Sequence, residues 1–536
     1  MGEDDLRVVD RSGSIIGTRE FTLNGLGSGV MSPPKERWVK VLDQTKCIGC
    51  HACTTACKSE NEVPLGVTRT YVKSVDIGIF PNVRRSFQVT RCNQCENPPC
   101  VAACPTAAMF QRADGIVDFD KSICIGCKAC MAACPYDAIF INPDDHSAEK
   151  CNFCAHRLDV GLEPACVTVC PTEAIFVGDL HDPTSKVSKV IHRQAVSVRK
   201  PEKTTRPGVF YKGAHQSTLD PLAAVRPNGD TFMWSEMIKG PKITNSGTPA
   251  AMHANSSAAA LLSYDVAHAV PWGWKVSLYT WTKGIASGFY PVVMLIALFG
   301  NLSMSSSLVR FWAPIVSLAA LTVTGVLLIA DLKHPERFYL LLIKPQWESW
   351  LVRGGFILLG YGGVLTLSLL LGIVNRGSLI LDLAPIGIVL GAATATYTAF
   401  LFSQAKARDL WQSPMLFPQL LVQAGMLGAG LVALLSSQVP VSTGHLMVHV
   451  FVGLVLVHEL FVAAEIVTIH PSAHSKLAVW EMTKGTMAWW FWIGTLGMLL
   501  GVGAVVQPDI AIVVSFIGLL SYEHSYVRSG QLAPLA

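Results

Sequence analysis

CIGCKACMAACP, residues 124–135, decides how the first third of this 536-residue chain folds. Its four cysteines follow the spacing C-x2-C-x2-C-x3-C, and a proline comes next. A run of this kind delivers three thiolates to one [4Fe-4S] cluster from a tight loop, while its fourth thiolate ligates a neighbouring cluster. The stretch therefore predicts an iron–sulfur domain in which neighbouring clusters draw on the same cysteine groups.

The remaining cysteines extend this pattern. All sixteen lie between Cys47 and Cys170, in four groups of four. A cubane cluster needs one sulfur ligand per iron, so each group supplies enough thiolates for one cluster. The sequence thus predicts four [4Fe-4S] clusters. The candidate ligands are Cys47, Cys50, Cys53, Cys57, Cys92, Cys95, Cys100, Cys104, Cys124, Cys127, Cys130, Cys134, Cys151, Cys154, Cys166 and Cys170.

Structural zinc and disulfide bonds are the alternatives for so many cysteines. Structural zinc takes four ligands from two separated pairs. Here the last two cysteines of every group have three residues between them, and Pro105, Pro135 and Pro171 follow the second, third and fourth groups. No stretch of signal-peptide length precedes the cysteines, which disfavours a disulfide framework. Iron–sulfur clusters are therefore favoured over zinc.

The later part of the chain is apolar. Charged residues make up only 15% of the sequence, and the mean hydropathy is +0.40. Segments long enough to cross a bilayer must satisfy their backbone groups internally, so we expect eight transmembrane helices. Five uncharged stretches cover residues 311–330, 354–374, 383–405, 413–436 and 485–507; three with interior charges cover about 276–300, 445–469 and 510–527.

Tryptophans and loop charges predict how these helices are oriented. Trp272, Trp274, Trp347, Trp350, Trp489 and Trp490 fall where interfacial aromatic belts are expected. The loops after the second, fourth and sixth spans hold seven Lys and Arg residues, against two in the other loops. Residues 1–40 contain no signal-like stretch. We therefore expect an inner-membrane protein with its iron–sulfur domain on the cytoplasmic side.

Two parts of the chain resemble known families. Residues 38 to about 215 resemble the four-cluster electron-transfer subunit of the dimethyl sulfoxide and polysulfide reductases. This resemblance rests on KCIGCHACTTACKSEN, CNQCENPPCVAACPTAA, CIGCKACMAACPYDA, KCNFCAHRL and GDLHDPTSKV. Residues from about 264 onward resemble the NrfD/polysulfide reductase membrane anchor, through VPWGWKVSLYTWTKGIASG, DLKHPERF and TATYTAFLF.

The resemblance implies a fold class and a domain order. The fold is an α+β bis-ferredoxin-like iron–sulfur domain, its halves related by a pseudo-twofold, followed by an all-α bundle of eight transmembrane helices. The expected parts are an extension (1–37), the four-cluster domain (38–230), a linker (231–263) and the membrane domain (264–536). The linker is rich in Met, Gly, Ala, Asn and Ser.

The resemblance also implies how the cysteines are shared among the clusters. Three ligands of each cluster come from one group and the fourth from another group. The implied sets are Cys47, Cys50, Cys53 with Cys170; Cys151, Cys154, Cys166 with Cys57; Cys92, Cys95, Cys100 with Cys134; and Cys124, Cys127, Cys130 with Cys104.

A quinone site is expected in the membrane domain. A quinone needs hydrogen-bond partners for both carbonyl oxygens and groups that pass protons to them. The resemblance implies a pocket near the first and fourth spans on the cluster side. The candidates are Tyr279, Lys283, Tyr397, Asp331, His334 and Arg337. For Asp331 and Arg337 a helix-end ion pair that fixes the loop is the alternative, and for Lys283 a side chain extended toward the interface.

The sixth span carries several ionisable residues. His445, His449 and Glu459 fall on roughly one face, with His458 and Glu465 on the opposite face. Three interpretations are open: satisfied interhelical polar contacts, a proton path to the quinone through residues such as His449 and Glu459 together with Glu523, or bis-histidine haem. Haem is least favoured, because only His524 offers a histidine on another span.

These observations give two functional hypotheses. The first is the electron-transfer and membrane-anchor subunit of a respiratory complex. It would connect a molybdenum or tungsten bis-pterin catalytic subunit to ubiquinone or menaquinone through the four clusters. The substrate chemistry would belong to that partner, and no nucleic acid is expected as a partner. The second hypothesis is an ion-translocating membrane protein driven by its ferredoxin domain.

Overall fold

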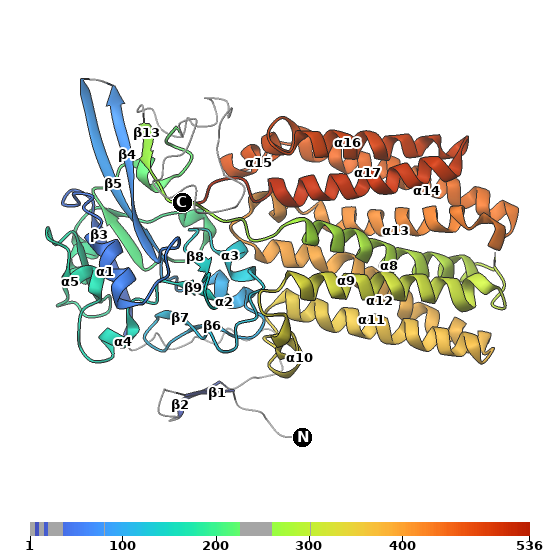
Figure 1. The fold of residues 1–536 in the computed structure, drawn as a ribbon, viewed down its shortest axis with the longest axis horizontal. Coiled ribbons are helices and arrows are strands. Elements are labelled where there is room, and N and C mark those ends of the chain that lie inside the picture. Colours follow the sequence, from blue (N-terminus) through green and yellow to red (C-terminus); the bar gives the residue numbers. More distant parts are fainter. Residues whose placement is uncertain (1–5, 10–14, 20–35, 80, 226–259, 301) are drawn as a thin grey trace. The chain divides into compact units, whose positions relative to one another are not determined.

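The computed structural model describes residues 6–9, 15–19, 36–79, 81–225, 260–300 and 302–536 (Figure 1). Strands β1 (Leu6–Val9) and β2 (Ile15–Arg19) form an antiparallel pair in a separate unit, Met1–Lys35. Glu36–Ala536 form one compact unit. Most of the expected N-terminal extension and linker lies outside the described residues; residues 260–263 belong to strand β13.

The cysteine-rich region combines small sheets with short helices. Its strands are β3 (Trp38–Asp43), β4 (Thr70–Ile79), β5 (Asn82–Arg91), β6 (Met109–Gln111), β7 (Val117–Phe119), β8 (Ile139–Ile141), β9 (Ala148–Lys150), β10 (Ile175–Asp179), β11 (Val196–Ser197), β12 (Val209–Lys212) and β13 (Ala260–Tyr264). Its helices are α1 (Ala52–Glu60), α2 (Pro99–Ala103), α3 (Ala129–Ala133), α4 (Ala155–Leu158), α5 (Ala165–Thr168), α6 (Lys186–Arg193) and α7 (Gln216–Leu219).

Strand β3 lies inside a four-stranded sheet of order β10-β3-β12-β11. Successive side chains of a strand point to opposite faces. Val39 and Val41 pack with Val187 of α6 on one face. On the other face, the Lys40 amine reaches the sulfur of Cys166. The alternation of β3 therefore delivers a buried lysine to the cysteine loops.

A second sheet has the order β13-β4-β5, with both pairs antiparallel. β4 and β5 pair over their full lengths, from Thr70 opposite Arg91 to Ile79 opposite Asn82. The hairpin end is exposed, and its base packs in the core beside the first cysteine group. Arg91 ends β5 directly before Cys92, so this strand also positions a cation at the cysteines.

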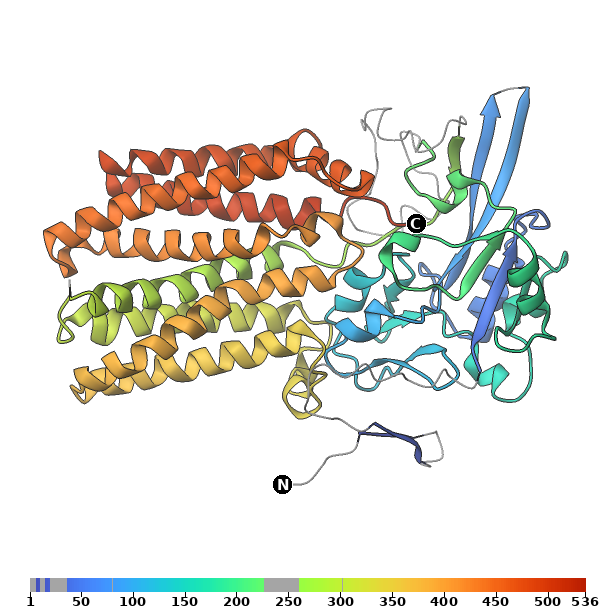
Figure 2. The ribbon, with the colours of Figure 1, turned by 180° about the vertical axis from the view of Figure 1, so that it is seen from behind.

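The membrane domain is helical. It contains α8 (Trp274–Leu298), α9 (Ala313–Asp331), α10 (Leu340–Ile343), α11 (Trp350–Ile373), α12 (Gly377–Gln404), α13 (Leu416–Leu434), α14 (Val441–Val467), α15 (Ala473–Thr483), α16 (Ala488–Leu499) and α17 (Pro508–Ser529). Within the described residues, eight helical segments are long and apolar enough to span a bilayer, which confirms the predicted number. Figures 1 and 2 show them side by side, with the cysteine-rich region at one end.

Helices α8, α13 and α17 form the interior of the bundle. In their most apolar stretches 72%, 67% and 67% of the residues are buried, against 22% in α11 and α14. Glycines allow α8 and α13 to approach closely: a Cβ on Gly288 would lie 1.8 Å from the carbonyl oxygen of Ala424, and one on Gly428 would lie 2.4 Å from that of Gly288. Polar side chains on these inner helices are therefore shielded from lipid.

Candidate cluster sites and membrane cavity

Equivalent backbone turns shape the first and third cysteine groups. Gly49 and Gly126, each directly before the second cysteine of its group, have φ angles of 70° and 66°. His51 and Lys128, directly after that cysteine, have φ angles of 60° and 63° and precede α1 and α3. These left-handed residues fold each run into a compact loop whose three leading cysteines line one space.

Two spaces are lined by cysteines from different groups. One cavity, of about 360 Å³, is bordered by Cys104, Cys124, Cys127 and Cys130. The other, of about 320 Å³, is bordered by Cys47, Cys50, Cys53 and Cys170. Each combines three cysteines of one group with one of another, as the resemblance implied. In the described part of the chain, no three Cys, His, Asp or Glu side chains are arranged around a single metal ion.

Electrostatic and hydrogen-bond contacts group the other eight cysteines. Asn61 donates to the sulfurs of both Cys57 and Cys154, at 3.7 Å each. Burial, followed by the charges of Cys151, Cys166 and Cys154, raises the pKa of the Cys57 thiol to about 12. The structure thus brings Cys57 to the fourth group.

Electrostatic contacts likewise bring a cysteine of the third group to the second group. Burial, followed by the charges of Cys92, Cys100 and Cys134, raises the pKa of the Cys95 thiol well above its ordinary value. Cys134 of the third group is therefore a neighbour of the second. Sixteen cysteines in four sets of four fit four [4Fe-4S] clusters, one ligand per iron.

The third cysteine group is docked on the membrane domain. Lys128 forms an ion pair with Asp331 at the end of α9, with 2.9 Å between Nζ and Oδ2. The guanidinium of Arg337 donates to the carbonyl oxygens of Lys121 (2.9 Å) and Cys124 (3.0 Å). His334 contacts the carbonyl oxygen of Asp145 through Nε2, at 2.7 Å. These three quinone candidates from DLKHPERF all contact the cysteine domain.

Two further loops of the membrane domain contact the protein around the cavity of Cys104, Cys124, Cys127 and Cys130. The backbone N–H of Gln346 donates to the carbonyl oxygen of Pro105 (2.9 Å), and the hydroxyl of Ser349 donates to that of Ala103 (3.0 Å). The indole of Trp272 donates to the carbonyl oxygen of Cys127 (3.3 Å). This cavity is thus the membrane-proximal one.

Trp272 differs from the interfacial role expected of it. It is 5% exposed and stacks on Phe402 and Trp411, with ring centroids 5.8 and 5.4 Å away. Trp274, Trp347, Trp489 and Trp490 are exposed, as aromatic-belt residues should be. Trp272 is buried because it packs between the third cysteine group and the bundle, a contact that its neighbours in sequence do not reveal.

A polar cavity of about 320 Å³ lies among α8, α12, α13 and α17. Its polar lining consists of Thr280, Thr398, Gln419, Gln423, Tyr522 and Glu523, and Phe402 is among its apolar residues. The Thr280 hydroxyl donates to Glu523 (2.8 Å), and the Gln419 amide donates to the Tyr522 hydroxyl (2.8 Å). Each polar residue of the cavity lies at most about two helical turns from the end of its helix that faces the cysteine domain. Because Trp272 bonds to Cys127 and stacks on Phe402, which lines the cavity, a continuous contact series joins Cys127 to this cavity.

Lys283, Tyr397 and Tyr279 lie beside this cavity. The Lys283 amine is buried and donates to Thr398 (2.6 Å) and to the carbonyl oxygen of Ala395 (2.8 Å). It stands 5.0 Å from the centre of the Tyr397 ring. Tyr279 is 2% exposed. The lysine therefore points inward, and the alternative that it extends toward the interface is wrong.

The sixth span contributes one of its ionisable residues to the cavity's surroundings. His458 is fully buried and contacts the amides of Gln423 (3.0 Å) and Gln419 (3.3 Å). Glu459 lies 3.7 Å from His458. His449 is exposed and contacts the carbonyl oxygen of His445 on its own helix.

Sequence reasoning missed most of the cavity's polar lining. Thr280, Thr398, Gln419, Gln423 and Tyr522 were not among the candidates. The pair Gln419 and Gln423, one turn apart within an otherwise apolar stretch, was a usable signal, because amides in a span need partners.

Comparisons with known proteins agree with this two-part construction. A family model for a 4Fe-4S dicluster domain matches residues 83–180, and one for polysulphide reductase, NrfD, matches residues 264–517. The B subunit of tetrathionate reductase from Salmonella typhimurium is 42% identical over 212 residues, which cover 38% of this chain and 82% of that protein.

Two further relatives match the same region. The B subunit of polysulfide reductase from Wolinella succinogenes is 44% identical over 178 residues, 33% of this chain and 93% of the relative. The B subunit of selenate reductase from Mesobacillus selenatarsenatis is 38% identical over 208 residues, 33% of this chain and 71% of the relative. The chain therefore belongs to the family of 4Fe-4S electron-transfer subunits of the dimethyl sulfoxide and polysulfide reductase type, joined here in one chain to an NrfD membrane anchor.

Proposed function

We propose that this chain is the electron-transfer and membrane-anchor subunit of a respiratory oxidoreductase complex. It connects a molybdenum or tungsten bis-pterin catalytic subunit to membrane quinone or quinol through four [4Fe-4S] clusters. The observation that carries the proposal is the contact series from Cys127 through Trp272 and Phe402 to the polar cavity. It joins a cysteine-lined space to a space lined by hydrogen-bonding side chains inside the bundle.

In this proposal each cluster is held by three cysteines of one group and one of another. When bound, a cluster supplies a site that accepts and releases one electron. The ligand sets are Cys47, Cys50, Cys53 and Cys170; Cys57, Cys151, Cys154 and Cys166; Cys92, Cys95, Cys100 and Cys134; and Cys104, Cys124, Cys127 and Cys130.

The polar cavity is the proposed quinone site. It brings hydroxyl, amide and carboxyl groups together inside an otherwise apolar bundle, as a quinone site requires. The hydroxyls of Thr280 and Tyr522 and the amide of Gln419 are placed to bond quinone oxygens, and Glu523 is placed to exchange a proton with them. Lys283 supplies positive charge nearby.

The candidates predicted from the sequence take different roles in this proposal. Asp331, His334 and Arg337 position the third cysteine group, because each contacts the cysteine domain. His458 contacts Gln419 and Gln423 at the cavity and Glu459 lies 3.7 Å from it, so these two ionisable side chains mark the proposed proton path toward the cavity.

The catalytic partner is expected at the opposite end of the cluster series. Cys50 is the one exposed cysteine among the sixteen, all of which are described. Ile48 and Leu65 beside this group are 57% and 82% exposed. A cluster near the surface with apolar residues around it suits electron exchange with a docked protein. The names of the relatives, each one component of a reductase, support a further subunit.

Metal analysis and quinol chemistry test the function together. Anaerobically purified protein should contain about sixteen irons and sixteen labile sulfides, four of each per cluster. Addition of a quinol analogue should then change the iron–sulfur absorbance. Cys100→Ala should disturb the cluster of Cys92, Cys95, Cys100 and Cys134 and so reduce this response, because quinol would still reduce the membrane-proximal cluster. Purified protein without inorganic sulfide, or a quinol response of full wild-type size in Cys100→Ala, would refute the proposal.

We also propose that the iron–sulfur domain faces the cytoplasm. Contacts at Asp331, Arg337 and Gln346 put it on the same side as the loops that hold seven of the nine Lys and Arg residues counted between spans. Positive charge favours the cytoplasmic side. Trypsin should therefore cleave this domain in inverted vesicles and spare it in right-side-out vesicles; the reverse pattern would show the opposite orientation.

A further inference from the structure

The cysteines Cys57, Cys151, Cys154 and Cys166 have an unusual electrostatic environment. Arg91 donates to the sulfur of Cys166 at 3.1 Å, and the Lys40 amine lies 3.7 Å from the same sulfur. Both cations are 1% exposed. Two buried positive charges therefore converge on one thiolate.

These cations have no carboxylate partner. Among the described residues, neither Arg91 nor Lys40 forms an ion pair with Asp or Glu, and Arg91 leaves Nε and Nη2 without hydrogen-bond partners. A buried cation without a counter-charge strongly destabilises a fold. An anionic group in the space beside Cys166 would compensate both, and a cluster with four thiolates is such a group.

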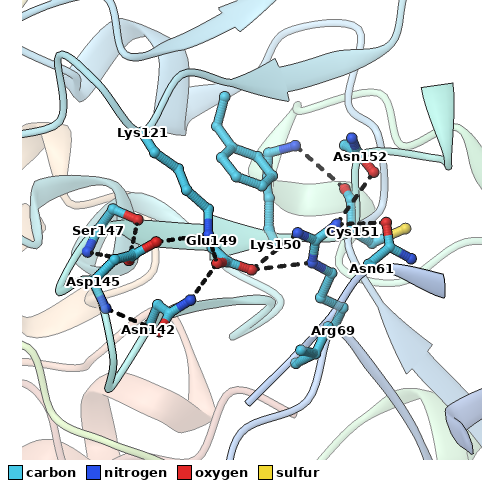
Figure 3. Close-up of polar contacts among 12 residues, drawn as sticks. Asn61, Arg69, Lys121, Asn142, Asp145, Ser147, Glu149, Lys150, Cys151 and Asn152 are labelled. Atoms are coloured by element: carbon cyan, nitrogen blue, oxygen red, sulfur yellow. Dashed lines mark hydrogen bonds and ion pairs between the residues drawn. The ribbon is translucent and has the colours of Figure 1, made fainter. Parts of the chain in front are cut away.

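A neutral donor completes this environment at two other sulfurs. Asn61 donates from its amide nitrogen to Cys57 and Cys154. Its amide oxygen accepts from Arg69 at 2.8 Å, and Arg69 is itself paired with Glu149 at 3.0 Å. Figure 3 shows this order, with Arg69 between Glu149 and Asn61. Because Arg69 occupies the amide oxygen, the amide nitrogen must face the sulfurs.

Among the described residues, no charged side chain donates to a sulfur in the other three cysteine sets, although the charge of Arg91 also acts on Cys53. Backbone amides donate to Cys104 and Cys124 at 3.4 Å and to Cys170 at 3.2 Å. Lys150 lies near the second group, but its amine donates to the carbonyl oxygens of Val117 and Cys151. Within the described residues, charged side chains donate to a cysteine sulfur only at Cys166.

We propose that Arg91, Lys40 and Asn61 give the cluster of Cys57, Cys151, Cys154 and Cys166 the highest reduction potential of the four. Reduction adds a negative charge to the cluster, and nearby positive charge and hydrogen bonds to sulfur stabilise it. The inference rests on the proposed ligand sets. Electrons entering the chain from either end would collect first at this cluster.

Redox titration of the full-length protein tests the inference. In titrations followed by electron paramagnetic resonance, the cluster with the highest midpoint should be the one whose signal Cys166→Ser alters. Arg91→Gln and Lys40→Met should each move that midpoint downward, and by more than they move any of the other three, because only Cys166 accepts hydrogen bonds from these cations. Arg85→Gln is the matched control, because Arg85 lies on the same strand but bonds to Asp76 at an exposed site.

Asn61→Ala provides a variant without a change of buried charge. It should lower the same midpoint by less than Arg91→Gln does, and it keeps the inference testable if Arg91→Gln fails to assemble. Unchanged midpoints in Lys40→Met and Asn61→Ala with full iron content would overturn the inference and leave the proposed function intact. A larger shift in a different cluster would overturn it equally. Wild-type protein without iron would overturn both.

Discussion

Lys128 and Asp331 join the third cysteine group to the end of α9 by an ion pair of 2.9 Å. Their side chains are 11% and 18% exposed, so solvent screens the pair only weakly. The sequence suggested that Asp331 would serve either a quinone or an ion pair with Arg337. Its partner is instead a residue between two cluster cysteines, Cys127 and Cys130, which makes this contact a link between the two domains.

Asp331→Asn should weaken the attachment of the cysteine domain to the bundle. The change removes the negative charge and leaves Lys128 largely buried without its partner. We expect a loss of about 1–3 kcal/mol in stability, between the values for exposed and buried pairs. The thermal midpoint of the detergent-solubilised protein should fall while its iron content stays unchanged.

A double-mutant cycle with Lys128→Met separates the pair from other effects of either residue. If Asp331→Asn and Lys128→Met destabilise the protein additively, the two side chains do not stabilise each other. A coupling energy near zero would thus contradict the assigned role of the pair.

Gly126→Ala should disturb the same docking surface through sterics. A Cβ on Gly126 would lie 2.4 Å from the Cβ of Lys333. Gly66→Ala is the control, because a Cβ on Gly66 would meet no atom of the described residues within 4 Å. Since φ at Gly66 is +83°, this variant has only the backbone strain, about 1–2 kcal/mol. We expect quinol-dependent cluster reduction to fall in Gly126→Ala and to persist in Gly66→Ala. Equal activity in both variants would argue against tight docking at Lys333.

Local patterns predicted the cysteine groups and the spans. The stretch 311–330 corresponds to the observed Leu308–Asp331, because an apolar run of bilayer length has few alternatives to a helix. The docking of Arg337 on Lys121 joins residues 216 positions apart. No periodicity encodes such a contact. Placing Asp331, His334 and Arg337 correctly required the packing of two domains against each other.

The residues that line the membrane cavity also could not be brought together from the sequence alone. Thr280, Gln419 and Glu523 come from three helices, and each looks like an isolated polar residue within its own span. Sequence spacing can show which face of a helix a side chain occupies, but it cannot show which face of another helix lies opposite. Lys283 was a candidate because a lysine in a span is costly, whereas its threonine and carbonyl partners on α12 came only with the structure.

The stability of the domain junction should depend on pH through His268. The His268 side chain is 12% exposed and contacts Asp137 (2.5 Å) and Asp265 (3.2 Å). Burial lowers its pKa, but the two carboxylates outweigh burial and raise the pKa from 6.5 to about 9. Folding thus favours the protonated ring. The stabilisation should be complete below pH 6.5 and should disappear as the pH rises through 9.

Thermal midpoints of wild type and His268→Gln measure this effect. The difference between them should be largest near pH 6 and should shrink between pH 6.5 and 9, because the glutamine side chain carries no titrating charge. His181→Gln, at an exposed position, is the control. A difference that stays constant over this range would show that the charge of His268 does not stabilise the junction.

Thr280→Val should separate quinone chemistry from cluster assembly. The variant removes the hydroxyl that donates to Glu523 in the polar cavity and keeps the shape of the side chain. Loss of one buried hydrogen bond costs about 1–1.5 kcal/mol, so quinol oxidation should slow by about tenfold. Thr282→Val is matched in chemistry and helix, but Thr282 bonds to Thr324 outside the cavity. Dithionite should reduce the clusters equally in both variants. If Thr282→Val slows quinol oxidation as much as Thr280→Val does, the quinone does not bind where Glu523 and Thr280 meet.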